Sequence, residues 1–111
     1  MSVIDRARAH YKSLPRKEIK VPEWGEEGEP LVIYASAMTV AHTDRISDEG
    51  NANKAEMFVD VLILKAQDAD GNMLFSDKDR HTLTREADKR VVSRIALEIL
   101  SGPDAKTLEG N

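Results

Sequence analysis

The stretch Met57-Phe58-Val59-Asp60-Val61-Leu62-Ile63-Leu64 decides how we expect this 111-residue chain to fold. Only Asp60 interrupts its apolar side chains, which at 100° per residue cover nearly the whole circumference of a helix. We predict this helix at about residues 52–66, after a break at Gly50-Asn51. A helix that is apolar on nearly all sides is normally buried. Because a small chain has few elements to cover it, we expect this helix to be central, with part of its surface facing a partner.

The sequence after this helix predicts a turn and then a short helix. Asp68-Ala69-Asp70-Gly71-Asn72 consists of residue types that favour tight turns. Ser76 and Asp79 follow with the spacing of a capping box, in which Asp takes the place of Glu. We therefore predict a short helix from Ser76 to about Leu83.

A long amphipathic helix is predicted at the C-terminal end. It begins at Thr84, with Asp88 in its first turn, where the helix dipole favours an acidic side chain. Gly102-Pro103 forms a standard helix stop. The apolar side chains that share one broad face are Ala87, Val91, Val92, Ile95, Ala96, Ile99 and Leu100.

Another helix is predicted before the central one. Thr39 has the side chain of an N-cap, and the helix extends to about Asp48. Its inner side is predicted to carry Val40, Thr43 and Ile46.

The first third of the chain predicts a helix followed by a β-hairpin. Ser2 and Asp5 have the capping spacing, and Pro15 ends the helix. The apolar positions of this helix recur at three- and four-residue intervals and are Val3, Ile4, Ala7, Tyr11 and Leu14. Alternating and β-branched residues then indicate a hairpin, in which residues 17–22 pair with residues 30–36.

These elements give an α+β, mainly helical fold. It consists of an N-terminal helix at 2–14, a hairpin at 17–36 and a helical body of about four helices at 39–101. We expect residues 1–103 to form a single domain, because 111 residues are too few for two cores. We expect residues 104–111, which lack apolar density, to form a flexible tail.

Composition favours a protein of the cytoplasm. Cysteine is absent, which excludes disulfides and thiol chemistry. The longest apolar run is far shorter than the roughly 20 residues that a membrane span needs. Asp5, Arg6 and Arg8 lie where a signal peptide would have its apolar stretch.

Candidate metal sites are incomplete in the sequence. The three histidines lie in separate predicted elements, and only Asp77 and His81, one helical turn apart, could serve as a pair of ligands. The segment around Gly71 resembles a calcium loop, but Gly71 at position six places Ala66 at the first ligand position and Asp77 at the twelfth. A tight turn therefore explains this segment better than a calcium site.

Catalytic motifs are equally incomplete. The chain has no Gly-x-Ser-x-Gly elbow, and its glycines are too dispersed for a phosphate-binding loop. Every Asp/Glu pair lies in a sequence typical of a helix cap, a turn or a solvated face. We predict that the protein is not an enzyme and has no cofactor.

Charge is distributed unevenly along the chain. Residues 1–22 carry six basic and two acidic groups, whereas the whole chain has a net charge of −4. A basic N-terminal segment on an acidic body fits a charged partner or self-association, although a solvated helix face explains it as well. The negative body would repel phosphate, which disfavours nucleic acid as a partner.

Some apolar side chains exceed what a small core needs. Trp24, the only tryptophan, lies in the hairpin connection, where it either covers the core or anchors a partner. Leu97 falls on the polar side of the last helix. Together with the central helix, these residues favour protein–protein association, with Trp24, Phe58, Leu64 and Leu97 as the predicted contact residues.

Two segments resemble a known family, the tail assembly chaperones of long-tailed phages and prophages. Val21-Pro22-Glu23-Trp24-Gly25 is similar to a segment of that family's hairpin. The stretch Asp68-Ala69-Asp70-Gly71-Asn72-Met73-Leu74-Phe75-Ser76-Asp77-Lys78-Asp79 is similar to its loop before the last helix, apart from Ala69 and Lys78. The resemblance covers about residues 16–101. It departs at residues 34–39, where relatives often have an Arg-containing turn that ends in Gly.

The resemblance implies a function in bacterial host cytoplasm. Such proteins coat the helical tape measure protein, keep it soluble and help to recruit the major tail (tube) protein, and they are absent from the finished particle. No membrane is involved. A tape measure protein exposes apolar helical stripes, which an acidic protein with spare apolar surface can cover.

Two alternatives remain open. The chain could be a structural component of the tail tube or neck that stays in the virion. It could also be a small regulatory protein that binds nucleic acid through residues 1–20.

Overall fold

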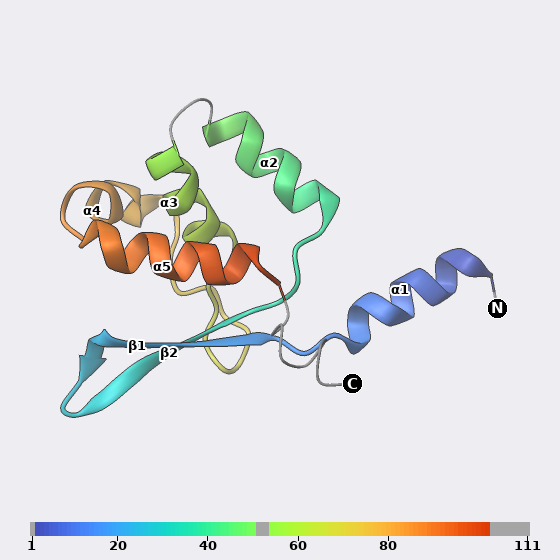
Figure 1. Cartoon of the computed structure of the whole chain (residues 1–111), viewed down its shortest axis with the longest axis horizontal. Coiled ribbons are helices and arrows are strands. Elements are labelled where there is room, and N and C mark those ends of the chain that lie inside the picture. Colours follow the sequence, from blue (N-terminus) through green and yellow to red (C-terminus); the bar gives the residue numbers. More distant parts are fainter. Residues whose placement is uncertain (1, 51–53, 103–111) are drawn as a thin grey trace.

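The computed structural model describes residues 2–50 and 54–102, and within them five α-helices, one 3₁₀ helix and one antiparallel hairpin follow each other (Figure 1). In chain order these are α1 (Val3–Ser13), β1 (Lys17–Glu26), β2 (Glu29–Ala35), α2 (Val40–Gly50), α3 (Lys54–Lys65), η1 (Asp77–Asp79), α4 (Arg80–Arg85) and α5 (Lys89–Leu100). The α+β, mainly helical class is thereby confirmed. The tail predicted at 104–111 lies outside the described residues.

The hairpin follows the predicted pairing. Lys17 lies opposite Ala35 and Val21 opposite Leu31. Side chains alternate between the two faces of a strand, so one face carries the buried set Ile19, Val21, Ile33 and Ala35. The turn consists of Glu27 and Gly28, both with positive φ, which is the geometry of a type I′ hairpin turn.

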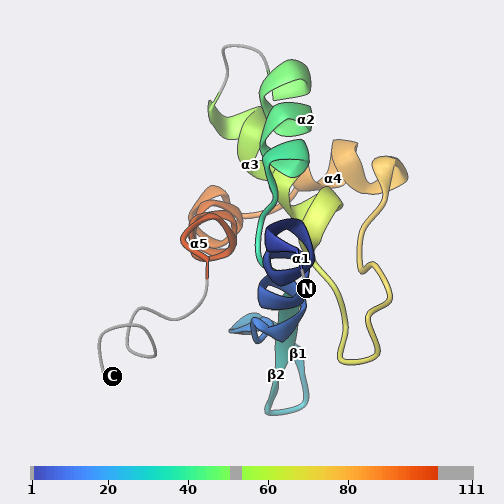
Figure 2. The same cartoon turned by 90° about the vertical axis from the view of Figure 1, so that its right-hand side faces the viewer.

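The helix α3 lies at the centre of the helical body, as predicted. Val59, Val61 and Leu62 are buried in the core, and the helix packs against α2, α4 and α5 (Figure 2). The helix α5 also packs against β1, so it links the helices to the sheet. The buried side chains of α5 are Val91, Val92, Ile95, Ala96 and Ile99, all on the predicted face.

The orientation predicted for α2 is wrong for two of its three inner residues. Ile46 is buried, but Val40 is 80% exposed and Thr43 is exposed. A reciprocal cap explains the difference: Thr39 Oγ1 accepts the backbone N–H of His42, and His42 Nδ1 accepts the backbone N–H of Thr39. The cap makes His42, one turn before Ile46, the half-buried residue of the first turn, and leaves Val40 in solvent.

The start predicted for the last helix is also wrong. The capping box of Ser76 and Asp79 forms as expected, but α4 ends at Arg85 and a new helix, α5, starts at Lys89. Asp88 is the N-cap of α5, where its carboxylate accepts the backbone N–H of Arg90 at 2.8 Å. An aspartate is a strong N-cap, and this preference exceeds that of Thr84 for the same task.

The helix α1 is formed as predicted but lies apart from the other elements (Figure 1). None of its residues is buried. The hydroxyl of Tyr11 donates a 2.6 Å hydrogen bond to the carbonyl oxygen of Ala37, in the linker between β2 and α2. We call α1 the arm and the elements from β1 to α5 the body.

The described helices are all too short or too polar to cross a membrane.

Candidate partner-binding surface

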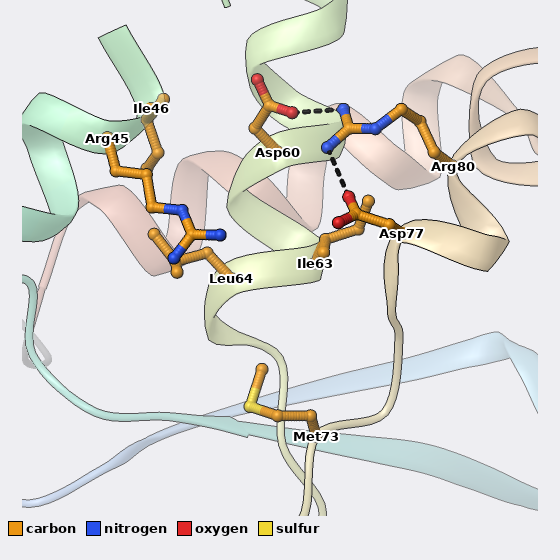
Figure 3. A pocket seen from close by; sticks show the side chains of 8 residues that line it. All are labelled: Arg45, Ile46, Asp60, Ile63, Leu64, Met73, Asp77 and Arg80. Atoms are coloured by element: carbon orange, nitrogen blue, oxygen red, sulfur yellow. Dashed lines mark hydrogen bonds and ion pairs between the residues drawn. The ribbon is translucent and has the colours of Figure 1, made fainter. Parts of the chain in front are cut away.

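Leu64 borders a hollow of about 200 Å³ between α2, α3 and the segment that leads into α4 (Figure 3). Its apolar lining comprises Ile46, Ile63, Leu64 and Met73. Ile63 and Leu64 are half-buried, and Met73 is 46% exposed. A methionine side chain adapts to irregular apolar partners, so this hollow offers a deformable apolar contact.

An ion-pair network forms the polar side of the same hollow. The guanidinium of Arg80 donates hydrogen bonds to the carboxylates of Asp60 and Asp77, the latter at 3.0 Å (Figure 3). Asp60 is only 5% exposed, so its charge requires this partner. The bond to Asp60 is the main cause that raises the pKa of Arg80. An isolated aspartate in the apolar run of α3 was the sequence signal for a basic partner, which the sequence analysis did not use.

Phe58 borders a second hollow, of about 140 Å³, on another side of α3. The hollow lies where α3 meets α4 and α5. Its apolar lining comprises Phe58, Val59, Leu83, Ala87 and Val92. Glu56 and Lys89 form part of its wall, so a mainly apolar partner would meet charge of both signs there.

Trp24 covers the core at the hairpin. It is half-buried and meets the ring of Phe75 edge-on, with centroids 6.2 Å apart and planes at 79°. Next to it, Glu23 accepts two hydrogen bonds from Arg94 of α5, at 2.9 and 3.0 Å. The hydrogen bonds from Arg94 are the main cause that lowers the pKa of Glu23. This geometry favours the core-covering interpretation of Trp24 over the partner anchor.

Leu97 is 54% exposed on α5, as its place on the polar side of the helix predicted. The four predicted contact residues therefore do not form one patch. Leu64 and Phe58 border different hollows, Trp24 covers the core, and Leu97 faces solvent. Their contact with a partner stays a prediction. Met73, which the sequence analysis did not select, adds exposed apolar surface beside Leu64.

The loop at residues 67–73 has a structural explanation. The carboxylate of Asp68 accepts the backbone N–H groups of Asp70 and Asn72 at 2.9 and 3.0 Å, and the Asn72 bond is the main cause that lowers its pKa. The guanidinium of Arg16 donates to the carbonyl oxygens of Asp68 and Ala69. The Asp68 oxygens thus hold the turn together. Among the described residues, no group of three His, Asp or Glu side chains is placed to hold a metal ion.

Lys65 is the least expected polar residue of the body. It is 2% exposed, and its Nζ donates to Ser36 Oγ at 2.7 Å and to the carbonyl oxygen of Ala37 at 3.3 Å. Burial lowers the pKa of Lys65. A serine next to such a lysine is a possible nucleophile–base pair, but neither residue lines the hollows beside Leu64 and Phe58. The contacts instead hold the linker between β2 and α2 against α3.

Comparisons with family models, with curated proteins and with solved structures give no match for this chain.

Proposed function

We propose that this protein is a tail assembly chaperone of a long-tailed phage or prophage, which acts by binding and not by catalysis. Its partner would be the tape measure protein, whose apolar helical stripes it would cover in the cytoplasm of the bacterial host. The complex of this protein with the tape measure protein would then recruit tail-tube subunits.

The observation that carries the proposal is the pair of hollows on two sides of α3. Each is lined by apolar and charged side chains and opens beside a half-buried side chain of α3, Leu64 in one and Phe58 in the other. Helix-in-groove binding uses such hollows to receive side chains that recur at helical spacing. Met73 and Leu97 add exposed apolar surface that the body does not cover.

The chaperone mechanism needs only weak contacts of each copy. A tape measure protein is long, so many copies can bind along one chain, and the effective concentration of neighbouring contacts strengthens the whole assembly. The hollows of about 200 and 140 Å³ are small, which suits this mode of binding better than a single tight site.

The direct test is co-expression with the tape measure protein that the proposal expects to be encoded beside this chain. We expect the soluble fraction of the tape measure protein to rise when the wild-type chain is present. Leu97→Asp and Met73→Glu should reduce this effect, because they place charge on exposed apolar contact positions. Val40→Asp is the matched control for Met73→Glu, since Val40 is 80% exposed and, unlike Met73, lines neither hollow. If the wild-type chain leaves tape measure solubility unchanged, the proposal fails.

A second measurement separates the chaperone from a structural tail component. Mass spectrometry of purified particles should find this chain absent or far below stoichiometric amounts. Stoichiometric copies in the particle would favour the tail-tube or neck component instead.

A further inference from the structure

The arm carries an apolar stripe that the body covers only at one end. Tyr11 and Leu14, next to the body, are half-buried. Along the same stripe, Val3 and Ile4 are 71% and 67% exposed. The stripe therefore continues for about two turns beyond the last contact with the body.

The arm is also basic. Between residues 2 and 14 it has three basic side chains, Arg6, Arg8 and Lys12, and one acidic side chain, Asp5. Arg8 is 3.4 Å from Asp5 in an exposed pair, whereas no ion pair of Arg6 or Lys12 occurs within residues 2–50 and 54–102. The exposed part of the arm thus combines apolar side chains with unpaired positive charge.

The opposite end of the molecule is acidic. We call residues 22–30, at the turn of the hairpin, the tip. The tip contains four glutamates and no basic residue. Glu23 pairs with Arg94, whereas Glu26, Glu27 and Glu29 are exposed. A shallow hollow of about 290 Å³ lies here, lined by Lys20, Pro22, Gly25, Glu26, Glu29 and Pro30 among others.

The arm and the tip lie at opposite ends of the long axis. In Figure 1 the arm extends to the right and the turn of the hairpin lies at the far left. A basic, partly apolar helix therefore points away from an acidic hollow with two proline rings in its wall. Within one molecule the two surfaces lie too far apart in this view to meet.

We propose that the arm of one copy of this chain binds the tip of the next copy, so that molecules associate head to tail. Val3 and Ile4 would lie against the prolines of the hollow, and Arg6 and Arg8 would face the glutamates. Such a contact joins two different surfaces, so it generates a row of molecules, or a ring where the rotation from copy to copy closes. This inference is independent of the proposed function, although a row of copies would suit a long partner.

Charge complementarity selects a second copy over other occupants. This same chain has an exposed acidic surface, the tip. The arm's three basic groups would bind nucleic acid only weakly. Rim charges of opposite sign raise the association rate and fix the orientation of docking.

The first test is sedimentation velocity of the full chain over a range of concentrations. In about 0.05 M NaCl, the weight-average sedimentation coefficient should rise with concentration and continue past the value of a dimer. In about 1 M NaCl, where the Debye length falls to roughly 3 Å, it should return toward the monomer value.

Charge reversal at either end supplies the decisive variants. The arm variant Arg6→Glu/Arg8→Glu has a negative arm and a negative tip. The tip variant Glu26→Lys/Glu29→Lys has a positive arm, and the hollow at its tip is then lined by three lysines and one glutamate. Each variant alone should associate at least about tenfold more weakly than the wild type. The reason is that the arm of one copy now repels the tip of the next copy.

An equimolar mixture of the two variants should restore association. The negative arm of one variant then meets the positive tip of the other, and the remaining arm and tip are complementary as well. Restoration also shows that both variants fold. The matched control Lys78→Glu/Arg85→Glu changes the net charge as much as the arm variant does, at exposed positions outside arm and tip, and should associate like the wild type.

Three results would overturn the inference. The first is a wild-type chain that stays monomeric at low salt, which would leave the arm for a different partner. The second is association that stops at a dimer, which would indicate a symmetric interface. The third is a variant mixture that associates no better than either variant alone. The soluble fraction of a tape measure protein tests the proposed function separately, so one idea can fail without the other.

Discussion

The helices α1 and α5 have nearly the same length, 11 and 12 residues, and both carry an apolar stripe, yet the molecule uses them in opposite ways. The stripe of α5 is buried by α3 and β1, and five of its residues are in the core. The stripe of α1 buries none. Hydrophobic periodicity therefore predicts that a helix forms and which side is apolar, but not what covers that side. In the arm, the body leaves Val3 and Ile4 exposed.

Truncating an apolar side chain in each of the two stripes should give the largest difference in the free energy of unfolding. Ile95 is fully buried in α5, so Ile95→Ala should lower the free energy of unfolding by about 2–5 kcal/mol, through lost transfer energy and a residual cavity. Ile4→Ala in the arm should change it by less than about 0.5 kcal/mol. Urea unfolding of both variants measures the contrast, and equal losses would mean that the arm is part of the core.

The buried carboxylate of the body gives the next largest effect. Arg80→Ala leaves Asp60 without its main partner, and because the Arg80 side chain is 38% exposed we expect a loss of about 1–3 kcal/mol, less than for a fully buried pair. Arg90→Ala is the control, since the Arg90 side chain is 91% exposed.

The neutral variant Asp60→Asn should cost less than Arg80→Ala, because an amide avoids the burial of an unpaired charge. If Asp60→Asn is the more damaging change, the network stabilises the body through charge and not through the satisfaction of Asp60.

The attachment of the arm should depend on one hydroxyl. Tyr11→Phe removes the hydrogen bond to Ala37 but keeps the ring, so the arm should open more easily by about 1 kcal/mol, or roughly fivefold. Hydrogen exchange should show faster exchange in α1 and unchanged protection in α3. Slower or unchanged exchange in α1 would mean that other contacts hold the arm.

The pH dependence of stability should give the smallest difference between the body and the arm. Burial, followed by the nearby charge of Lys65, lowers the pKa of His42 below its ordinary value of 6.5. Below that pH the unfolded chain binds more protons at this site than the folded chain, so the free energy of unfolding should fall as the pH drops from about 6.5 to 5. Protonation would also remove the hydrogen bond that His42 Nδ1 accepts from Thr39.

His42→Gln should therefore flatten the stability profile in this pH window. The control is His10→Gln, because His10 is exposed on the arm. Urea unfolding at several pH values measures both profiles, and an equal slope in the wild type and His42→Gln would contradict the assignment.

Local signals in the sequence predicted most of the elements. The capping box of Ser76 and Asp79, the alternation of Ile19 and Val21, and the apolar face of α5 each depend on neighbouring residues alone. The errors arose where two local signals competed. Thr84 and Asp88 both have N-cap side chains, and Asp88, which was predicted to lie in the first turn after Thr84, forms the cap. Val40 has an apolar side chain, but the cap of Thr39 and His42 sets the orientation of α2.

The candidate surface was less predictable because it depends on long-range packing. Phe58 and Leu64 belong to one apolar run of the sequence. This run alone does not predict that the two side chains border different hollows. The sequence does not predict the exposure of Met73, which directly follows the turn that Asp68 holds together. Lys65 gave no sequence signal for burial, since its partners Ser36 and Ala37 lie 29 and 28 residues earlier in the chain.

The place of Trp24 has a spectroscopic consequence. It is the only tryptophan of the chain and belongs to the tip, where its ring lies edge-on against Phe75. Fluorescence emission excited at the indole band therefore reports on the environment of the tip alone. A change in emission on self-association, without any label, would place the contact at that end of the molecule.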